Sequence, residues 1–250
     1  MSENQTSLDH LLDGRVVLRQ PKQGYRAGSD PVFLAAGTAA KTGQSVLDLG
    51  CGVGAASLCL LARIPGISVT GLELQPALAA LAGENAVANG FAGSFTVIQG
   101  CLAGMPDELR CRSFDHVITN PPWYGQGTAS HPPVESKRIG HMEDVLDLAG
   151  WLAEAVKRIR PRGHLTVVHR ADRVGDILVA LAPLKMGAVR IYPLWPRAGA
   201  AAARIVVTAR KDVRTPTTLS SGLVLHGESG EYTAAAQSVL RDACSLPGQE

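Results

Sequence analysis

The sequence predicts an α/β domain with a doubly wound, mostly parallel sheet of seven strands, one of which is antiparallel to the rest. Short apolar runs alternate with helical segments along the chain, a pattern typical of parallel strands covered by helices on both faces. The last two strand-like runs of the sheet, 188–194 and 204–210, are joined by only nine residues. That connection is too short for a crossover helix, so we expect these two strands to pair in antiparallel fashion.

The composition indicates one soluble domain. A chain of 250 residues with 46% hydrophobic residues can bury a core, and a net charge of +2 requires any basic surface to be local. Residues 1–13 are polar and lack the apolar stretch of a signal peptide or membrane span, so we expect a flexible leader, a single domain over 14–250, and a cytoplasmic protein without membrane contact. The five cysteines are scattered without ligand spacing, which predicts no metal site.

The first part of the domain, residues 14–44, is predicted to form a basic hairpin followed by a helix. Apolar and basic residues favour a strand over 15–20, and a return strand is expected to start at Tyr25. The next helix is expected to cover 32–40, with Asp30 capping its first N–H groups.

The central stretch begins with an apolar run over 45–49, which predicts a short buried parallel strand. Glycines follow it at alternate positions, Gly50, Gly52 and Gly54, and a helix is expected to start at Ala55. Glycine allows positive φ and lets the backbone approach a ligand, and the N–H groups at the helix start face the same place. The sequence therefore predicts a ligand at this turn.

The remaining segments continue the alternation of strands and helices. The other strands of the sheet are expected at 67–72, 94–99, 114–119 and 164–169. Helices are expected at 76–89, 143–160 and 172–182, and a long loop at 124–141. The C-terminal appendage, 212–250, contains a strand-like run over 223–226, a turn over 227–230 and a short helix from Thr233.

Polar signals lie at the carboxyl ends of these strands, where open α/β sheets bind ligands. Glu73 ends the strand after the glycine turn, and an acid there can accept two hydrogen bonds from ribose hydroxyls, which indicates a nucleoside-containing cofactor. Asp48 lies inside the end of the central strand, and a carboxylate there suits a cofactor with a positive charge rather than NAD. The third signal, 120–123, follows another strand of the sheet directly.

These motifs carry a family resemblance. Asp48-x-Gly50-x-Gly52-x-Gly54 resembles motif I of class I S-adenosylmethionine-dependent methyltransferases, and Asn120-Pro-Pro-Trp123 resembles their N-P-P-[YFW] motif. The whole chain, including the segment 20–32, resembles the bacterial tRNA1(Val) adenine-37 N6-methyltransferase family. This resemblance implies a Rossmann-like methyltransferase fold, S-adenosylmethionine as cofactor, and methyl transfer to the exocyclic N6 of adenine in RNA. A tRNA anticodon-loop adenine is the expected acceptor.

The motifs and the resemblance together assign three groups of site residues. The catalytic group is Asn120, Pro121, Pro122 and Trp123. The cofactor-binding group is Asp48, Gly50, Cys51, Gly52, Gly54, Glu73, Leu74, Cys101 and Asn120. The substrate-binding group is Arg19, Lys22, Tyr25, Arg26 and Tyr124.

The N-P-P-W motif has a physical role that fits a conjugated amine. Such an amine is a poor nucleophile, because its lone pair is delocalised into the ring. The side-chain oxygen of Asn120 and the carbonyl of Pro121 can accept its two hydrogens, favour a pyramidal nitrogen and direct the lone pair at the methyl group. Trp123 can stack on the base. No strong general base is required, because the nitrogen becomes acidic once it is methylated.

Four basic residues and no acid lie between Gly14 and Ser29; they are Arg15, Arg19, Lys22 and Arg26. Such a cluster is typical of a solvated edge, but beside a base-modifying site it becomes a candidate for phosphate contacts. Tyr25 could stack on an unpaired base, and the loop 124–141 could close over the target.

One position departs from the family pattern, which usually has an acid after the third strand in contact with the cofactor adenine. Here Cys101 occupies the matching stretch, and a thiol is a weak partner for an amino group. Either the affinity for the cofactor is lower, or another group such as Gln99 substitutes.

Two other functions remain open. A protein glutamine N5-methyltransferase shares the N-P-P chemistry, but it would carry a separate N-terminal helical domain, and only residues 1–44 precede the central strand. A non-catalytic S-adenosylmethionine or RNA-binding module is the second alternative. The leading interpretation implies RNA, in the form of tRNA, as partner, no metal, and a monomer or a homodimer.

Overall fold

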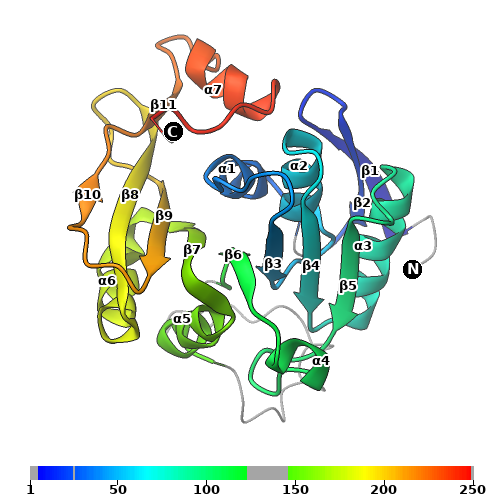
Figure 1. Cartoon of the computed structure of the whole chain (residues 1–250). Helices are drawn as coiled ribbons and strands as arrows, with labels where there is room; N and C mark the ends of the chain where they lie inside the picture. The colour runs from blue at the N-terminus through cyan, green and yellow to red at the C-terminus, as the bar shows by residue number, and fades with distance from the viewer. Residues whose placement is uncertain (1–4, 25, 123–145, 249–250) are drawn as a thin grey trace.

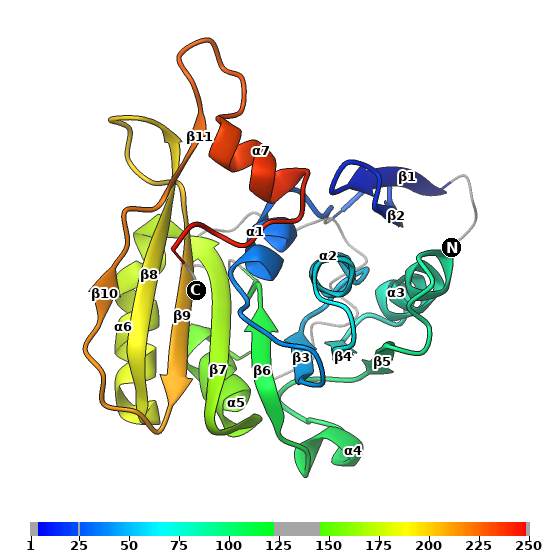
Figure 2. The same ribbon diagram turned by 45° about the horizontal axis from the view of Figure 1, so that its top comes forward.

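The computed structural model of the chain describes residues 5–24, 26–122 and 146–248, and Figures 1 and 2 show its arrangement in two views. Within these residues, nine strands form one sheet in the order β10-β8-β9-β7-β6-β3-β4-β5, with β11 beside β8. The strands of this sheet are β3 (Ser45–Leu49), β4 (Ser68–Glu73), β5 (Phe95–Gln99), β6 (Phe114–Thr119), β7 (Ile159–Arg170), β8 (Met186–Arg197), β9 (Arg204–Lys211), β10 (Thr218–Leu219) and β11 (Leu223–His226).

Helices cover both faces of the sheet. The helices are α1 (Asp30–Ala36), α2 (Ala55–Arg63), α3 (Pro76–Ala88), α4 (Asp107–Arg110), α5 (Leu148–Lys157), α6 (Val174–Leu181) and α7 (Ala234–Leu240), and short 3₁₀ turns flank α6 at 171–173 and 182–184. Side chains of α1, α2, α3 and α7 form one apolar core, and those of α4, α5 and α6 form a second. Successive residues of β3 supply the two cores, since Val46 belongs to the first and Leu47 to the second.

The doubly wound, mostly parallel sheet is confirmed, and so is its one antiparallel strand. β9 pairs in antiparallel fashion with β7 on one side and with β8 on the other. The expected number of seven strands is wrong, because β10 and β11 of the C-terminal segment both pair parallel with β8. The outer edge of β8 presents backbone N–H and C=O groups, and the C-terminal segment pairs with that edge through β10 and β11.

The N-terminal prediction also needs correction. Residues 6–11, expected in a flexible leader, form β1 (Thr6–Leu11), which pairs in antiparallel fashion with β2 (Val16–Pro21). The hairpin therefore lies upstream of the expected one, and Tyr25, the expected start of a return strand, falls outside the described residues. The sequence pattern misses β1 because this segment is polar and shows little apolar alternation. β2, which buries Val16 and Leu18 completely, provides the backbone edge with which β1 pairs.

Some expected helix ends and one expected cap differ from the structure. α1 spans Asp30–Ala36, whereas the sequence predicts a helix over 32–40. Asp30 does not cap α1; its carboxylate instead accepts a hydrogen bond from Nε of Arg204 at 3.0 Å. In the described residues α5 begins at Leu148, with Asp147 capping it by accepting the N–H of Gly150 at 2.8 Å. It ends at Lys157 rather than at 160, because the chain then pairs with β6 as the start of β7.

Candidate active site

The glycine turn between β3 and α2 is confirmed as a tight strand-to-helix connection. Gly50, Gly52 and Gly54 have φ values of 71°, 57° and 85°, in the left-handed region where side chains are strained. A Cβ on Gly54 would also lie 2.7 Å from the ring of Phe95. The N–H groups of Gly50 and Cys51 both donate to the carbonyl of Leu72 on β4, which holds the turn against the neighbouring strand.

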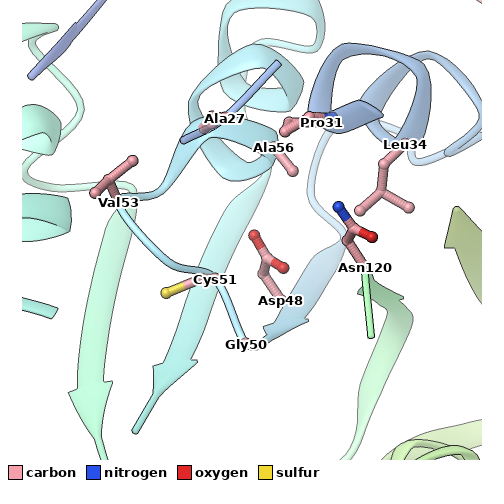
Figure 3. A pocket seen from close by; sticks show the side chains of 10 residues that line it. Ala27, Pro31, Leu34, Asp48, Gly50, Cys51, Val53, Ala56 and Asn120 are labelled. Atoms are coloured by element: carbon pink, nitrogen blue, oxygen red, sulfur yellow. The ribbon is translucent and has the colours of Figure 1, made fainter. Parts of the chain in front are cut away.

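A cavity opens beside this turn, and Figure 3 shows the side chains that line it. Asp48 at the end of β3 and Asn120 just after β6 both face it, because the two strands are neighbours in the sheet. The complete lining is Ala27, Pro31, Leu34, Asp48, Gly50, Cys51, Val53, Ala55, Ala56 and Asn120. The structure thus brings predicted cofactor residues and the predicted catalytic asparagine to one place. The apolar wall from α1 and the segment before it was not among the predicted site residues.

Asp48 has an unusual electrostatic environment. Its side chain is buried, and its Oδ2 accepts a hydrogen bond from the hydroxyl of Ser57 on α2 at 2.7 Å. Burial raises the pKa of Asp48 to about 7, and the nearby carboxylate of Glu73 also raises it. The hydrogen bond from Ser57 lowers this pKa but does not offset the effect of burial. A positive group in the cavity would stabilise the ionised carboxylate. Asp48 therefore fits a cationic ligand, in line with the sequence prediction.

Glu73 lies at the end of β4 and supports the glycine turn. Its Oε2 accepts the N–H of Gly52 at 2.9 Å, and its Oε1 accepts the N–H of Gln75 at 2.8 Å. Each carboxylate oxygen has a further lone pair, so both can still accept hydrogen bonds from hydroxyl groups. The contact with ribose stays a prediction, but the carboxylate is fixed at the turn in the way that such a contact requires.

The asparagine–proline corner is tied to the glycine turn by two side chains that the sequence did not indicate. The hydroxyl of Thr119 donates to the carbonyl of Leu49 at 2.8 Å, and Nε1 of Trp151 donates to that hydroxyl at 2.9 Å. The ring of Trp151 would also lie 3.2 Å from a Cβ placed on Gly50. Trp151 is on α5, and no local pattern marks a contact between residues that are so far apart in sequence.

The other predicted catalytic residues follow this corner. Pro121 is buried and Pro122 is exposed, and the chain there has neither helix nor strand. Trp123, Tyr124 and the loop 124–141 fall outside the described residues, so their roles stay predictions.

Three further cofactor residues are placed less directly. Cys51 lines the cavity, but its sulfur packs closely against Gly71, and burial raises the pKa of its thiol well above the usual value. Leu74 is 42% exposed, and Cys101 is half-buried beyond the end of β5; neither belongs to the cavity lining. Among the described residues, no group of three or more histidine, cysteine and acidic side chains could hold a metal ion.

The basic residues of the hairpin are less uniform than the sequence indicates. Arg26 forms an ion pair with Asp9 of β1 at 2.8 Å and also donates to the hydroxyl of Ser7, so an acid does face the cluster. Arg19 is half-buried, whereas Lys22 is exposed. Tyr25 lies outside the described residues. Within the described ranges, no helix is long and apolar enough to cross a bilayer.

Comparison with known proteins gives a family match over residues 29–176, to the family described as the methyltransferase small domain. A Porphyromonas gingivalis protein named tRNA1(Val) (adenine(37)-N6)-methyltransferase is 27% identical over 172 residues, which are 66% of this chain and 67% of that protein. A Shewanella baltica protein of the same name is 26% identical over 222 residues, covering 88% and 92%. A solved structure of an Agrobacterium tumefaciens protein, described as a predicted O-methyltransferase, has a TM-score of 0.71 at 24% identity and covers 87% of this chain and 97% of that one. This likeness confirms the Rossmann-like methyltransferase fold.

Proposed function

The chain belongs to the methyltransferase small domain family, and from that premise we propose that it transfers a methyl group from S-adenosylmethionine to the exocyclic N6 of adenine in RNA. The observation that carries the proposal is that Asp48 and Asn120 face one cavity beside the glycine turn. The relatives named tRNA1(Val) (adenine(37)-N6)-methyltransferase support an adenine of a tRNA anticodon loop as the acceptor.

The residues around the cavity fit S-adenosylmethionine. When bound, this cofactor supplies a methyl group on a positively charged sulfur. The buried carboxyl of Asp48 is suited to a cationic group, and the glycines of the turn place no side chain between their own backbone and a ligand. Glu73 retains acceptor positions for ribose hydroxyls. Leu74 and Cys101 would lie toward the adenine, as the family resemblance implies.

Asn120 and Pro121 would hold the acceptor amine. Their oxygens would accept hydrogen bonds from its two N–H groups and direct its lone pair toward the methyl group that bound S-adenosylmethionine would supply, with S-adenosylhomocysteine as the leaving group. The excess proton leaves the nitrogen for solvent. Acceptors placed in advance in a cavity with little water act most strongly where charge develops. Trp123 remains the proposed stacking residue for the base, and Tyr124 remains a predicted substrate-binding residue.

An RNA loop suits such a site, because an unpaired base enters a cavity without the cost of opening a duplex. Arg19 of β2 and three residues that follow this strand in the sequence, Lys22, Tyr25 and Arg26, are proposed to contact the phosphates and bases around the target. A tRNA substrate also supports a cytoplasmic location. A monomer or a homodimer would be compatible with this mode of binding.

The deciding experiment supplies the protein with labelled S-adenosylmethionine and total tRNA, followed by digestion and chromatographic identification of the labelled nucleoside. We expect labelled N6-methyladenosine, and we expect Asn120→Ala to lower kcat by about 10²–10³-fold. Because Asn120 also belongs to the predicted cofactor-binding group and lines the cavity, the affinity of this variant for S-adenosylhomocysteine is measured in parallel, and kcat at saturating cofactor isolates the effect on the acceptor. If the label appeared on a glutamine of a protein, the proposed substrate would be a protein rather than RNA. Tight cofactor binding without any methyl transfer would indicate a non-catalytic binding module.

A further inference from the structure

Two asparagines, Asn85 on α3 and Asn89 at the C-cap of that helix, hold the β1–β2 hairpin against the domain. Asn85 Oδ1 accepts the backbone N–H of Arg19 at 2.8 Å, and its Nδ2 donates to the carbonyl of the same residue at 2.9 Å. One helical turn later, Asn89 makes the equivalent pair with Val17, at 2.8 and 2.7 Å. Each side-chain amide thus bonds to β2 as a residue of a neighbouring strand would.

The spacing of these contacts has a simple geometric cause. Four residues along a helix rise about 6 Å, and two residues along a strand rise about 6.6 Å. Side chains at i and i+4 of a helix lie on one face, so Asn85 and Asn89 reach alternate residues of β2. The N–H and C=O groups on this edge of the hairpin are thereby satisfied by α3 rather than by another strand.

The two asparagines differ in their remaining bond. Asn89 uses Nδ2 a second time within its own helix, donating to the carbonyl of Asn85 at 2.7 Å. Asn85 instead donates to the carbonyl of Val53 at 2.9 Å, between Gly52 and Gly54 in the turn beside the cavity. Asn85 is only 2% exposed, so these bonds form away from water. A single planar amide therefore joins the hairpin to the glycine turn.

We propose that Asn85 is a positioning residue that couples the glycine turn to the β1–β2 hairpin, so that binding at the turn and RNA contact at the hairpin reinforce each other. A ligand that fixes the backbone of the turn fixes the Val53 carbonyl. Because the side-chain amide of Asn85 is rigid, its bonds to Arg19 are then held in place as well. Coupling between two sites is reciprocal, so RNA on the hairpin should raise cofactor affinity by the same factor. The identity of the two ligands rests on the proposed function.

The first test needs no RNA and no turnover. Hydrogen exchange of the β1–β2 amides is measured with and without S-adenosylhomocysteine, in wild type, Asn85→Ala and the matched control Asn89→Ala. We expect the ligand to slow exchange of the hairpin in wild type and in Asn89→Ala, even though the hairpin of that variant exchanges faster overall. In Asn85→Ala the ligand should no longer slow it. Equal protection by the ligand in Asn85→Ala and Asn89→Ala would overturn the coupling.

The second test measures tRNA affinity with and without S-adenosylhomocysteine. In wild type we expect the ligand to raise tRNA affinity by about fivefold or more. Asn89→Ala should weaken tRNA binding, but the ligand should still raise tRNA affinity by the same factor as in wild type. In Asn85→Ala the ligand should leave tRNA affinity nearly unchanged. If Asn85→Ala does not fold, Asn85→Leu serves instead, because it fills a similar volume and removes the amide that bonds to Arg19 and Val53.

The outcomes separate this proposal from the proposed function. Ligand binding without protection of the wild-type hairpin would overturn the coupling and leave the methyltransferase assignment intact. Failure to bind the ligand at all would overturn the cofactor assignment, and the coupling with it. The protein could also fail to methylate RNA while the ligand still protects the hairpin in wild type and not in Asn85→Ala. That result would support the coupling and would reject only RNA as the substrate.

Discussion

The indole N–H of Trp151 donates to the hydroxyl of Thr119 at 2.9 Å, and that hydroxyl donates in turn to the carbonyl of Leu49 at 2.8 Å. The residues that follow these two strand ends are Asn120 and Gly50, which lie on opposite sides of the proposed methyl transfer. Thr119 thus bridges the two strand ends, which are also paired in the sheet, and we infer that Trp151 orients its hydroxyl for this contact. Small displacements between reacting groups have large effects on rate.

Removing the indole N–H should therefore lower the rate more than it lowers stability. We expect Trp151→Phe to reduce kcat by about tenfold and the free energy of unfolding by about 1 kcal/mol, the usual net value of one hydrogen bond. Trp195→Phe is the matched control, because Nε1 of Trp195 donates to the carbonyl of Ser221 at 3.0 Å away from the cavity. Turnover under saturating substrates and urea unfolding measure the two effects. An equal loss of kcat in both variants would contradict a role for Trp151 in positioning.

The pKa of Asp48 predicts how cofactor affinity depends on pH. Burial raises this pKa from 3.8 to about 7, and pairing with the α-ammonium group of the ligand requires the ionised form. We therefore expect the affinity for S-adenosylhomocysteine to rise as the pH increases through about 7. Asp48→Asn should bind more weakly and lose this pH dependence. Calorimetric titration between pH 5.5 and about 8.5 measures both effects, and an unchanged profile in Asp48→Asn would exclude Asp48 as the group responsible.

The same group affects the stability of the ligand-free protein. Between pH 3.8 and about 7 the folded protein keeps a proton on Asp48 that the unfolded chain has lost. Raising the pH through this window therefore lowers the free energy of unfolding. Burial lowers the pKa of His116 to about 4, which contributes the opposite slope, so the informative quantity is the difference between wild type and Asp48→Asn. That difference should grow as the pH rises to about 7, with the variant becoming relatively more stable.

Glu73 should contribute to cofactor affinity both directly and through the turn. Glu73→Ala removes the proposed ribose acceptor and leaves the N–H groups of Gly52 and Gln75 without their carboxylate partner. We expect the affinity for S-adenosylhomocysteine to fall by at least about tenfold, equivalent to about 1.4 kcal/mol. Glu84→Ala, at an exposed acid on α3, is the control and should bind normally. Unchanged affinity in Glu73→Ala would contradict the ribose assignment.

The hairpin cations should differ in how they affect RNA binding. Lys22 is exposed, so Lys22→Ala should weaken tRNA binding and reduce the slope of log affinity against log salt by about one. Arg26 is paired with Asp9, so Arg26→Ala should also loosen the hairpin and increase its hydrogen exchange. Lys41→Ala is the control at an exposed lysine near the start of β3 and should leave the salt slope unchanged. An identical slope in wild type and Lys22→Ala would exclude a phosphate contact there.

Local chemistry in the sequence determined the elements that build the cavity. The apolar run over 45–49 and the three glycines after it predict a buried strand and a turn with positive φ, because both depend on side-chain pattern and backbone freedom within ten residues. The short connection after β8 predicts its antiparallel partner for the same local reason. Because Asp48 and Asn120 lie at the carboxyl ends of two parallel strands, they meet at the same end of the sheet.

Tertiary structure alone decided which distant residues support these motifs. The ion pair between Asp30 and Arg204 and the contacts of Trp151 and Asn85 join distant segments that no periodic pattern relates. Each is a hydrogen bond whose partner is selected by how helices and strands pack, and a polar residue carries the same donors and acceptors whichever partner it meets. The sequence by itself therefore determined the strand, the turn and the polar groups at the cavity, because these depend on local pattern, whereas the packing of the chain determined the apolar wall of the cavity and the contacts that hold it in position.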